Sequence, residues 1–205
     1  MHIINQKIEQ VFVITSPYTY YRLDRLIPIM KQEDIRYKII VAPDKRYFTE
    51  PAQSLISANE SILLESKINR YNSICIIEDD IYFVDNYKEK FESFYNRLNK
   101  WDILKLGYQP HCEYKDINKV DIVYKIKQND NAIGAQINCY NISVYDILLN
   151  VYKKSKIHLD IELNKLYYKF LSYTPVEHIF YGCSYREYEK DKSESYKCYP
   201  SSLTL

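Results

Sequence analysis

Three adjacent carboxylates, Glu78, Asp79 and Asp80, are the residues of this sequence best suited to chemistry. They directly follow the apolar run Ile74 to Ile77, which has the continuous hydrophobicity of a strand buried on both faces. Carboxylates crowded beside an apolar core repel one another unless a cation neutralises them. We therefore predict a divalent-metal site, because Mg²⁺ and Mn²⁺ prefer one or two carboxylates together with water and phosphate.

A metal bound there could bridge a diphosphate and stabilise the charge that grows on it as a leaving group. Because side chains alternate along a strand, we expect Glu78 and Asp80 to face one way as metal ligands and Asp79 to face the other. The alternative is a solvated acidic turn after a core strand. The acids alone do not decide between the two.

The remaining apolar patterns predict the elements that position these acids. Apolar runs predict strands at 11–16, 37–42, 74–77, 101–107, 120–126 and 132–140, and helical spacing predicts helices over 23–30, 52–70, 85–100 and 143–152, the last capped by Ser143. This alternation predicts an α/β fold, a single Rossmann-like domain with a mostly parallel central sheet and sites at the carboxyl ends of the strands. We expect residues 1–183 to form the domain and the polar residues 184–205 to form a C-terminal extension.

The composition excludes several classes of function. The 205 residues contain 28 Lys and Arg against 27 Asp and Glu, and a net charge of +1 gives no reason to expect nucleic acid as a partner. No window approaches the roughly 18 apolar residues that a membrane span requires. The five cysteines include no C-x-x-C pair, which argues against a disulfide framework and a zinc knuckle.

These features predict a cytoplasmic protein with reduced thiols. The 23 tyrosines, together with abundant Ile, Lys and Asn, are typical of an AT-rich coding sequence. We therefore expect a low-GC bacterial or a viral source, and in the viral case the host cytoplasm.

Three segments occur in an order that is informative as a set. The run IIEDDIYF carries the acids, Arg22-Leu23-Asp24-Arg25 follows the first predicted strand, and WDILKLG lies downstream. This order resembles the family 25 glycosyltransferases, which are lipopolysaccharide-type and collagen-type sugar transferases with Leu-Glu-Asp-Asp-like, Arg-x-Asp-Arg-like and Trp-Asp-x-x-x-Leu-Gly segments. The resemblance covers roughly residues 10–180. The chain departs from the family in having only three glycines and in placing Ala135-Gln136 where the family often has Thr-His or a similar pair.

The resemblance implies a GT-A fold and a metal-dependent, inverting transfer of a hexose. The donor would be a nucleotide diphosphate sugar, with a UDP-sugar favoured, and the acceptor a hydroxyl of a glycan or a protein. Carried over to this chain, it places Thr15, Arg22 and Asp79 near the nucleotide and Asp44 near the base or ribose. The metal, Mn²⁺ or Mg²⁺, would bind at Asp80 together with a neighbouring acid.

Inverting transfer also needs a carboxylate within reach of the acceptor hydroxyl. Asp160 is the first candidate for this base and Glu162 the second, although acids at the start of a helix are also common because they complement the helix dipole. His178, in a late loop, is a candidate third metal ligand. The alternative for His178 is a structural role beside apolar neighbours.

Two other functions fit parts of the pattern. A nucleotidyltransferase also grips metal and phosphate with acids at strand ends, but it would favour a glycine-rich loop after the first strand, and VITSPYTYYR contains no glycine. A non-catalytic scaffold or binding protein could keep the fold and lose the chemistry. The intact acids weigh against that reading.

Overall fold

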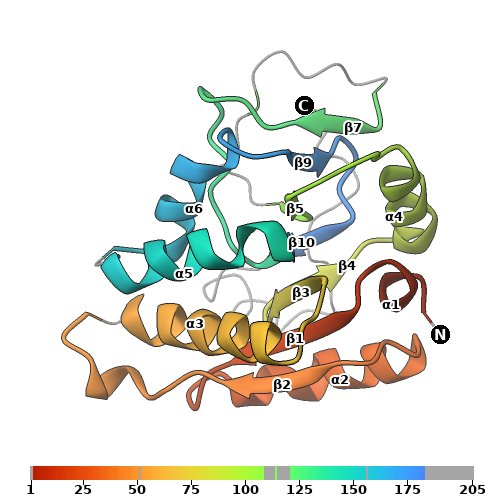
Figure 1. Cartoon of the computed structure of the whole chain (residues 1–205). Coiled ribbons are helices and arrows are strands. Elements are labelled where there is room, and N and C mark those ends of the chain that lie inside the picture. Colours follow the sequence, from red (N-terminus) through yellow and green to blue (C-terminus); the bar gives the residue numbers. More distant parts are fainter. Residues whose placement is uncertain (1, 51, 109–113, 115–120, 156, 183–205) are drawn as a thin grey trace.

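A seven-stranded sheet forms the middle layer of the protein, and helices cover both of its faces (Figure 1). The computed structural model describes residues 2–50, 52–108, 114, 121–155 and 157–182, so the expected C-terminal extension, residues 184–205, lies outside the described residues. The strands lie in the order β2-β1-β3-β8-β5-β9-β7. Their bounds are β1 Gln10–Thr15, β2 Lys38–Val41, β3 Ser73–Glu78, β5 Ile103–Lys105, β7 Val123–Lys125, β8 Ile137–Asn141 and β9 Ser172–Pro175.

The sheet is mostly parallel, as the sequence predicts. Strands β1, β2 and β3 are parallel to one another, β8 runs antiparallel between β3 and β5, β9 is parallel to β5, and the edge strand β7 is antiparallel. Five of the seven strands therefore point the same way. As a result, the carboxyl ends of β1, β2 and β3 meet at one edge of the sheet, where open α/β folds bind their ligands.

The central strands are apolar throughout because both of their faces are covered. Helices α3 (Ala52–Ile68), α5 (Tyr145–Lys154) and α6 (Leu159–Tyr167) pack on one face, and α1 (Ile3–Lys7), α2 (Leu23–Gln32) and α4 (Tyr87–Asn96) pack on the other. Alternate residues of β1 enter different cores: Phe12 joins the first and Val13 the second. This double burial explains why these strands read as continuous apolar runs.

A small second sheet adjoins the carboxyl edge. It contains β4 (Ile81–Phe83), β10 (Phe180–Gly182) and β6 (Gly107–Tyr108), in the order β4-β10-β6. Strand β4 begins directly after the acidic turn that follows β3. The turn is therefore held between two sheets.

The prediction that Ser143 caps the helix after β8 is wrong. A short 3₁₀ turn, Ile142–Val144, precedes α5, and the side chain of Asn141 accepts a hydrogen bond from the backbone N–H of Ser143. The hydroxyl of Ser143 instead donates to Asp102 at 2.6 Å. Asn141 takes the capping position instead of Ser143, because an Asn side chain readily accepts a hydrogen bond from the backbone N–H two residues further along the chain. The strand expected at 132–140 begins only at Ile137.

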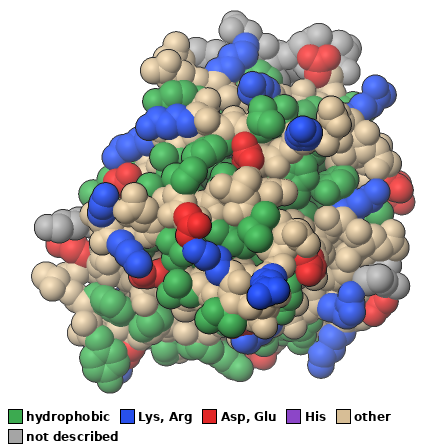
Figure 2. Space-filling view, viewed as in Figure 1, with side chains coloured by type: hydrophobic (Ala, Val, Ile, Leu, Met, Phe, Trp, Pro, Cys, Tyr) green, Lys and Arg blue, Asp and Glu red, His purple; other side chains and the backbone are tan. Residues whose placement is uncertain are grey.

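Charges of both signs are interspersed on the face that carries α3 and α5 (Figure 2). Lys67 of α3 pairs with Asp146 of α5, and Lys38 of β2 pairs with Glu65 of α3 at 2.5 Å. Among the described residues, no helix is both long and apolar enough to cross a membrane.

Candidate functional site

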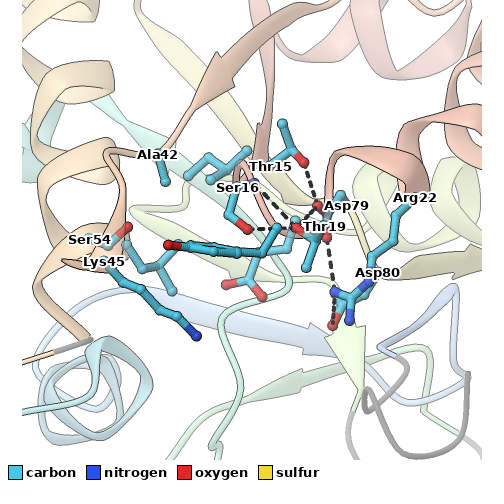
Figure 3. A pocket seen from close by; sticks show the side chains of 13 residues that line it. Thr15, Ser16, Thr19, Arg22, Ala42, Lys45, Ser54, Asp79 and Asp80 are labelled. Carbon is cyan, nitrogen blue, oxygen red and sulfur yellow. Dashed lines mark hydrogen bonds and ion pairs between the residues drawn. The ribbon is translucent and has the colours of Figure 1, made fainter. Parts of the chain in front are cut away.

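A pocket of about 260 Å³ opens where β1, β2 and β3 end (Figure 3). Its wall includes Thr15 from the end of β1, Ala42 from just past β2, and the three acids from the end of β3. Residues of the loop after β1 and the start of α3 complete it. Parallel strands bring these residues together although they are far apart in the sequence, and this was expected from the strand order alone.

Asp79 is the most tightly bound of the three acids. It is 4% exposed, and its Oδ2 accepts hydrogen bonds of 2.6 Å from the hydroxyls of both Thr15 and Thr19. Its Oδ1 accepts one from Arg22 Nη1 at 3.1 Å (Figure 3). The two hydroxyls and the Arg22 guanidinium stabilise the charge of Asp79 and orient it, so this carboxylate ties β1, the following loop and the 3₁₀ turn Tyr20–Arg22 before α2 to the end of β3.

Arg25, one helical turn after Arg22, fixes the backbone of the acidic turn. Its Nη1 donates to the carbonyl of Ile81 at 2.8 Å and its Nη2 to that of Asp79 at 3.2 Å. The guanidinium also lies 3.6 Å from the centre of the Tyr82 ring. A planar guanidinium can make both contacts at once, which a lysine cannot.

Glu78 and Asp80 have less compensation than Asp79. Burial, opposed by Arg22 and reinforced by Asp79, raises the pKa of Asp80 to about 6. Burial, followed by the charges of Asp80, Asp79 and Asp160, raises the pKa of Glu78 well above its usual value. Oδ1 of Asp80 is buried and has no hydrogen-bond partner within the described part of the chain. Two neighbouring carboxyl groups therefore lack sufficient positive charge.

The alternation expected for the three acids does not extend past Glu78. Strand β3 ends at that residue, and Asp79 and Asp80 lie in the turn that follows. Arg22 Nη1 consequently reaches both of them, Asp79 at 3.1 Å and Asp80 Oδ2 at 3.8 Å. The predicted opposition of Asp79 to Asp80 fails because strand geometry stops where the turn begins.

The two candidate bases occupy different environments at the start of α6. Asp160 lies close enough to Glu78 for its charge to raise the pKa of that residue. Glu162 pairs with Lys165 at 3.3 Å on the same helix. Only Asp160 is thus linked electrostatically to the acids of β3.

His178 does not join Glu78 and Asp80. No group of three or more His, Cys, Asp or Glu residues among those described is arranged to hold a metal ion. Burial and the charge of Lys90 lower the pKa of His178 to about 4, and Glu177 opposes them. His178 instead lies within reach of the charge of Lys90 on α4, and the preceding Glu177 pairs with Lys90 at 3.5 Å.

Asp44 lies beside the pocket and is engaged by neighbouring side chains. It accepts hydrogen bonds from Arg46 Nη2 at 2.6 Å and from the hydroxyl of Tyr18 at 2.5 Å. These bonds lower the pKa of Asp44. Tyr18 lines the pocket and is 43% exposed, and Lys45 Nζ lies 4.9 Å from the centre of its ring. Asp44 therefore holds an aromatic side chain at the pocket wall.

The sequence analysis gave no role to Thr19 or Tyr18, and it named Arg25 only as part of the Arg22-Leu23-Asp24-Arg25 segment. Thr19, Arg22 and Arg25 recur at intervals of three, the spacing that places side chains on one side of a helical segment. That spacing could have indicated a common partner. Only the folded structure shows that this common partner is the acidic turn after β3.

No protein-family model matches this sequence, and a comparison with curated proteins finds no match. Solved structures do resemble it. A glycosyltransferase involved in the glycosylation of the major capsid of PBCV-1 has a TM-score of 0.56 at 10% identity, over 90% of this chain and 98% of that one. A protein described as a glucose-1-phosphate thymidylyltransferase of Bacillus anthracis has a TM-score of 0.52 at 11% identity, over 90% and 94%.

The protein has the fold of these transferases. Similarity at this level of identity establishes the fold alone. It agrees with the predicted GT-A-like architecture and does not distinguish family 25 from other groups that share it.

Proposed function

We propose that this protein is a metal-dependent glycosyltransferase that moves a hexose from a nucleotide diphosphate sugar, with UDP favoured, to a hydroxyl of a glycan or a protein. The observation that carries the proposal is the pair of undercompensated carboxyl groups, Glu78 and Asp80, in a pocket at the ends of parallel strands. A diphosphate alone would add negative charge to these acids. A divalent cation bound together with the diphosphate would compensate the negative charge of the diphosphate and of the two carboxylates.

The residues at this edge suit Mg²⁺ or Mn²⁺. Such ions are commonly held by one or two carboxylates and complete their coordination with water and substrate phosphate, so no third protein ligand is needed. Glu78 and Asp80 would hold the ion, and the buried Oδ1 of Asp80, which has no hydrogen-bond partner in the part of the chain that the structure describes, fits that role. When bound, the ion would supply Lewis-acid stabilisation of the charge on the leaving diphosphate.

The protein's own residues have distinct tasks in this proposal. The pocket beside Tyr18 and Thr15 would take the nucleoside, and Asp79 with its three donors would keep the acidic turn rigid. Arg25 would hold the carbonyls of that turn in place. Rigidity matters because a misplaced donor loses the alignment that transfer requires.

In the transfer step, the acceptor oxygen forms a bond to the anomeric carbon while the bond from that carbon to the diphosphate oxygen breaks. The nucleotide diphosphate departs with the electron pair, and the configuration at the anomeric carbon inverts. The proton of the acceptor hydroxyl passes to a carboxylate, for which we propose Asp160 because its charge is felt at Glu78. Glu162 is less suitable because it is paired with Lys165.

Nucleotidyl transfer remains the rival, since a structure of that class shares the fold. The loop between β1 and α2 contains no glycine, and the hydroxyls of Thr15, at the end of β1, and Thr19, in the loop, both donate to Asp79. It therefore offers no glycine-rich cradle for a triphosphate. This observation favours the glycosyltransferase.

Calorimetry with UDP, UDP-glucose and UTP, in Mn²⁺ and in chelator, would test the proposal. We expect the first two to bind only with metal, and Asp80→Ala to abolish that binding. Asp85→Ala, which changes an exposed acid, is the matched control and should bind normally. Failure of every nucleotide to bind would contradict the proposal and favour a scaffold role, and binding of UTP alone would favour nucleotidyl transfer.

A further inference from the structure

Gln136 is a buried polar residue that the proposed chemistry leaves unused. It is 7% exposed, and its Oε1 is buried with no hydrogen-bond partner in the described residues. Its backbone carbonyl accepts a 2.7 Å hydrogen bond from the backbone N–H of Glu78. A buried amide oxygen that lacks a partner is uncommon in native proteins and calls for an explanation.

The strand register places the Gln136 side chain beside that of Glu78. Ile77 of β3 pairs with Ile137, the first residue of β8, and the hydrogen bond from the Glu78 N–H to the Gln136 carbonyl continues this antiparallel pairing by one residue beyond β8. Directly opposed residues project to the same face of a sheet. Ile77 and Ile137 both enter the core under α2 and α4, so Glu78 and Gln136 face the opposite side, where α6 carries Asp160.

The start of β6 packs closely against the residue that follows Gln136. A Cβ on Gly107 would lie 2.8 Å from Ile137 Cγ2 and 3.1 Å from Ile137 N, whereas Gln136 Cβ would lie at an ordinary contact distance of 3.5 Å. Glycine at position 107 therefore lets β6 approach Ile137. The backbone of Gln136 is held by its hydrogen bond to Glu78 and by the packing of Ile137, while its side-chain oxygen has no hydrogen-bond partner among the described residues.

The order of strands along the edge matches the order of groups in a nucleotide sugar. The pocket spans the ends of β2, β1 and β3, the acids lie at the end of β3, and Gln136 lies one strand further, at a spacing of about 4.8 Å. A donor with its nucleoside in the pocket and its diphosphate at the acids would place its sugar against Gln136 and α6.

We infer that the Gln136 side-chain amide hydrogen-bonds a hydroxyl of the transferred sugar and so determines which nucleotide sugar is accepted. This inference rests on the proposed function. An amide offers both an acceptor and donors, which suits a sugar hydroxyl. A site built to bond a hydroxyl discriminates strongly against sugars that lack it or point it elsewhere.

The test compares UDP with UDP-glucose, UDP-galactose and UDP-N-acetylglucosamine by calorimetry in Mn²⁺. The variants are Gln136→Leu, which keeps the volume without the amide, and Gln136→Asn, which keeps the amide but withdraws it. Gln128→Leu, in an exposed turn, is the matched control. Thermal melts establish that each variant folds.

For wild type we expect one UDP-sugar to bind better than the others. Gln136→Leu should retain UDP affinity within about twofold and reduce the affinity for the preferred sugar nucleotide at least tenfold, which would flatten the preference. Gln136→Asn should do the same to a smaller degree. Unchanged sugar preference in both variants would overturn the inference and leave the proposed function intact. No nucleotide binding by wild type would overturn both.

Discussion

The hydroxyl of Thr15 donates a 2.6 Å hydrogen bond to Oδ2 of Asp79, joining the last residue of β1 to the turn after β3. Both residues are almost fully buried, at 2% and 4% exposure. A hydrogen bond to a buried carboxylate is stronger than one between neutral groups, and losing it leaves charge uncompensated. The pair thus fixes the edge at which the acids meet.

Replacing Thr15 with Val removes this bond and keeps the side-chain shape. We expect a loss of about 1–2 kcal/mol in the free energy of unfolding, because Thr19 still donates to the same oxygen. Urea unfolding of wild type and Thr15→Val measures this loss. Thr49→Val, at an exposed position, should change stability by less than about 0.5 kcal/mol. Equal effects of the two substitutions would contradict the role of Thr15.

The pKa of Asp80 gives a pH-dependent stability with a definite sign. The pKa is raised to about 6 in the folded protein, against about 3.9 for an unfolded Asp. Between these values the folded chain binds more protons than the unfolded one, so the metal-free protein loses stability as the pH rises from about 4 to 6. Asp80→Asn removes this cost.

In chelator, Asp80→Asn should therefore be more stable than wild type by about 1–3 kcal/mol at pH 7, and the difference should vanish near pH 4. Urea unfolding at several pH values measures this difference. Asp85→Asn is the control, and its difference from wild type should stay flat. A stability gain for Asp80→Asn that stays constant from pH 4 to 7 would show that folding does not raise the pKa of Asp80.

Arg25→Lys keeps the charge and loses the fork that reaches both carbonyls and stacks on Tyr82. We expect a stability loss of about 1–2 kcal/mol and weaker Mn²⁺-dependent nucleotide binding, because the acidic turn loosens. Thermal unfolding and calorimetry measure the two effects. Arg97→Lys, at an exposed position after α4, should leave both unchanged. Wild-type nucleotide affinity in Arg25→Lys would contradict the proposal that Arg25 positions the acidic turn for nucleotide binding.

Asp160→Asn and Glu162→Gln form a matched pair on α6. If Asp160 receives the acceptor proton, its substitution should lower the transfer rate by about 10²–10⁴-fold with little change in donor affinity. Glu162→Gln should cost less than about fivefold, since Glu162 faces Lys165. Release of UDP from a sugar nucleotide with a glycan or protein acceptor is the readout. The reverse order of effects would transfer the role to Glu162.

Much of the fold follows from local pattern. The apolar runs around Val13 and Ile76 are continuous because helices bury both faces of β1 and β3, and burial of this kind is visible in sequence. The acids after Ile77 stand out for the same reason, since charge directly after a core strand is conspicuous. The strand and helix order then predicts the layered architecture and the edge at which a site forms.

The tertiary structure decided which partners each acid has. Asp79 accepts hydrogen bonds from Thr15, Thr19 and Arg22, whereas an oxygen of Asp80 has no hydrogen-bond partner among the described residues, and nothing in the order Glu-Asp-Asp distinguishes the two. The difference arises where a strand ends and a turn begins, because side-chain direction there depends on long-range contacts. The nearness of Gln136 to Glu78 became visible only when β8 paired with β3, since strand pairing joins residues 58 positions apart that no local periodicity can relate.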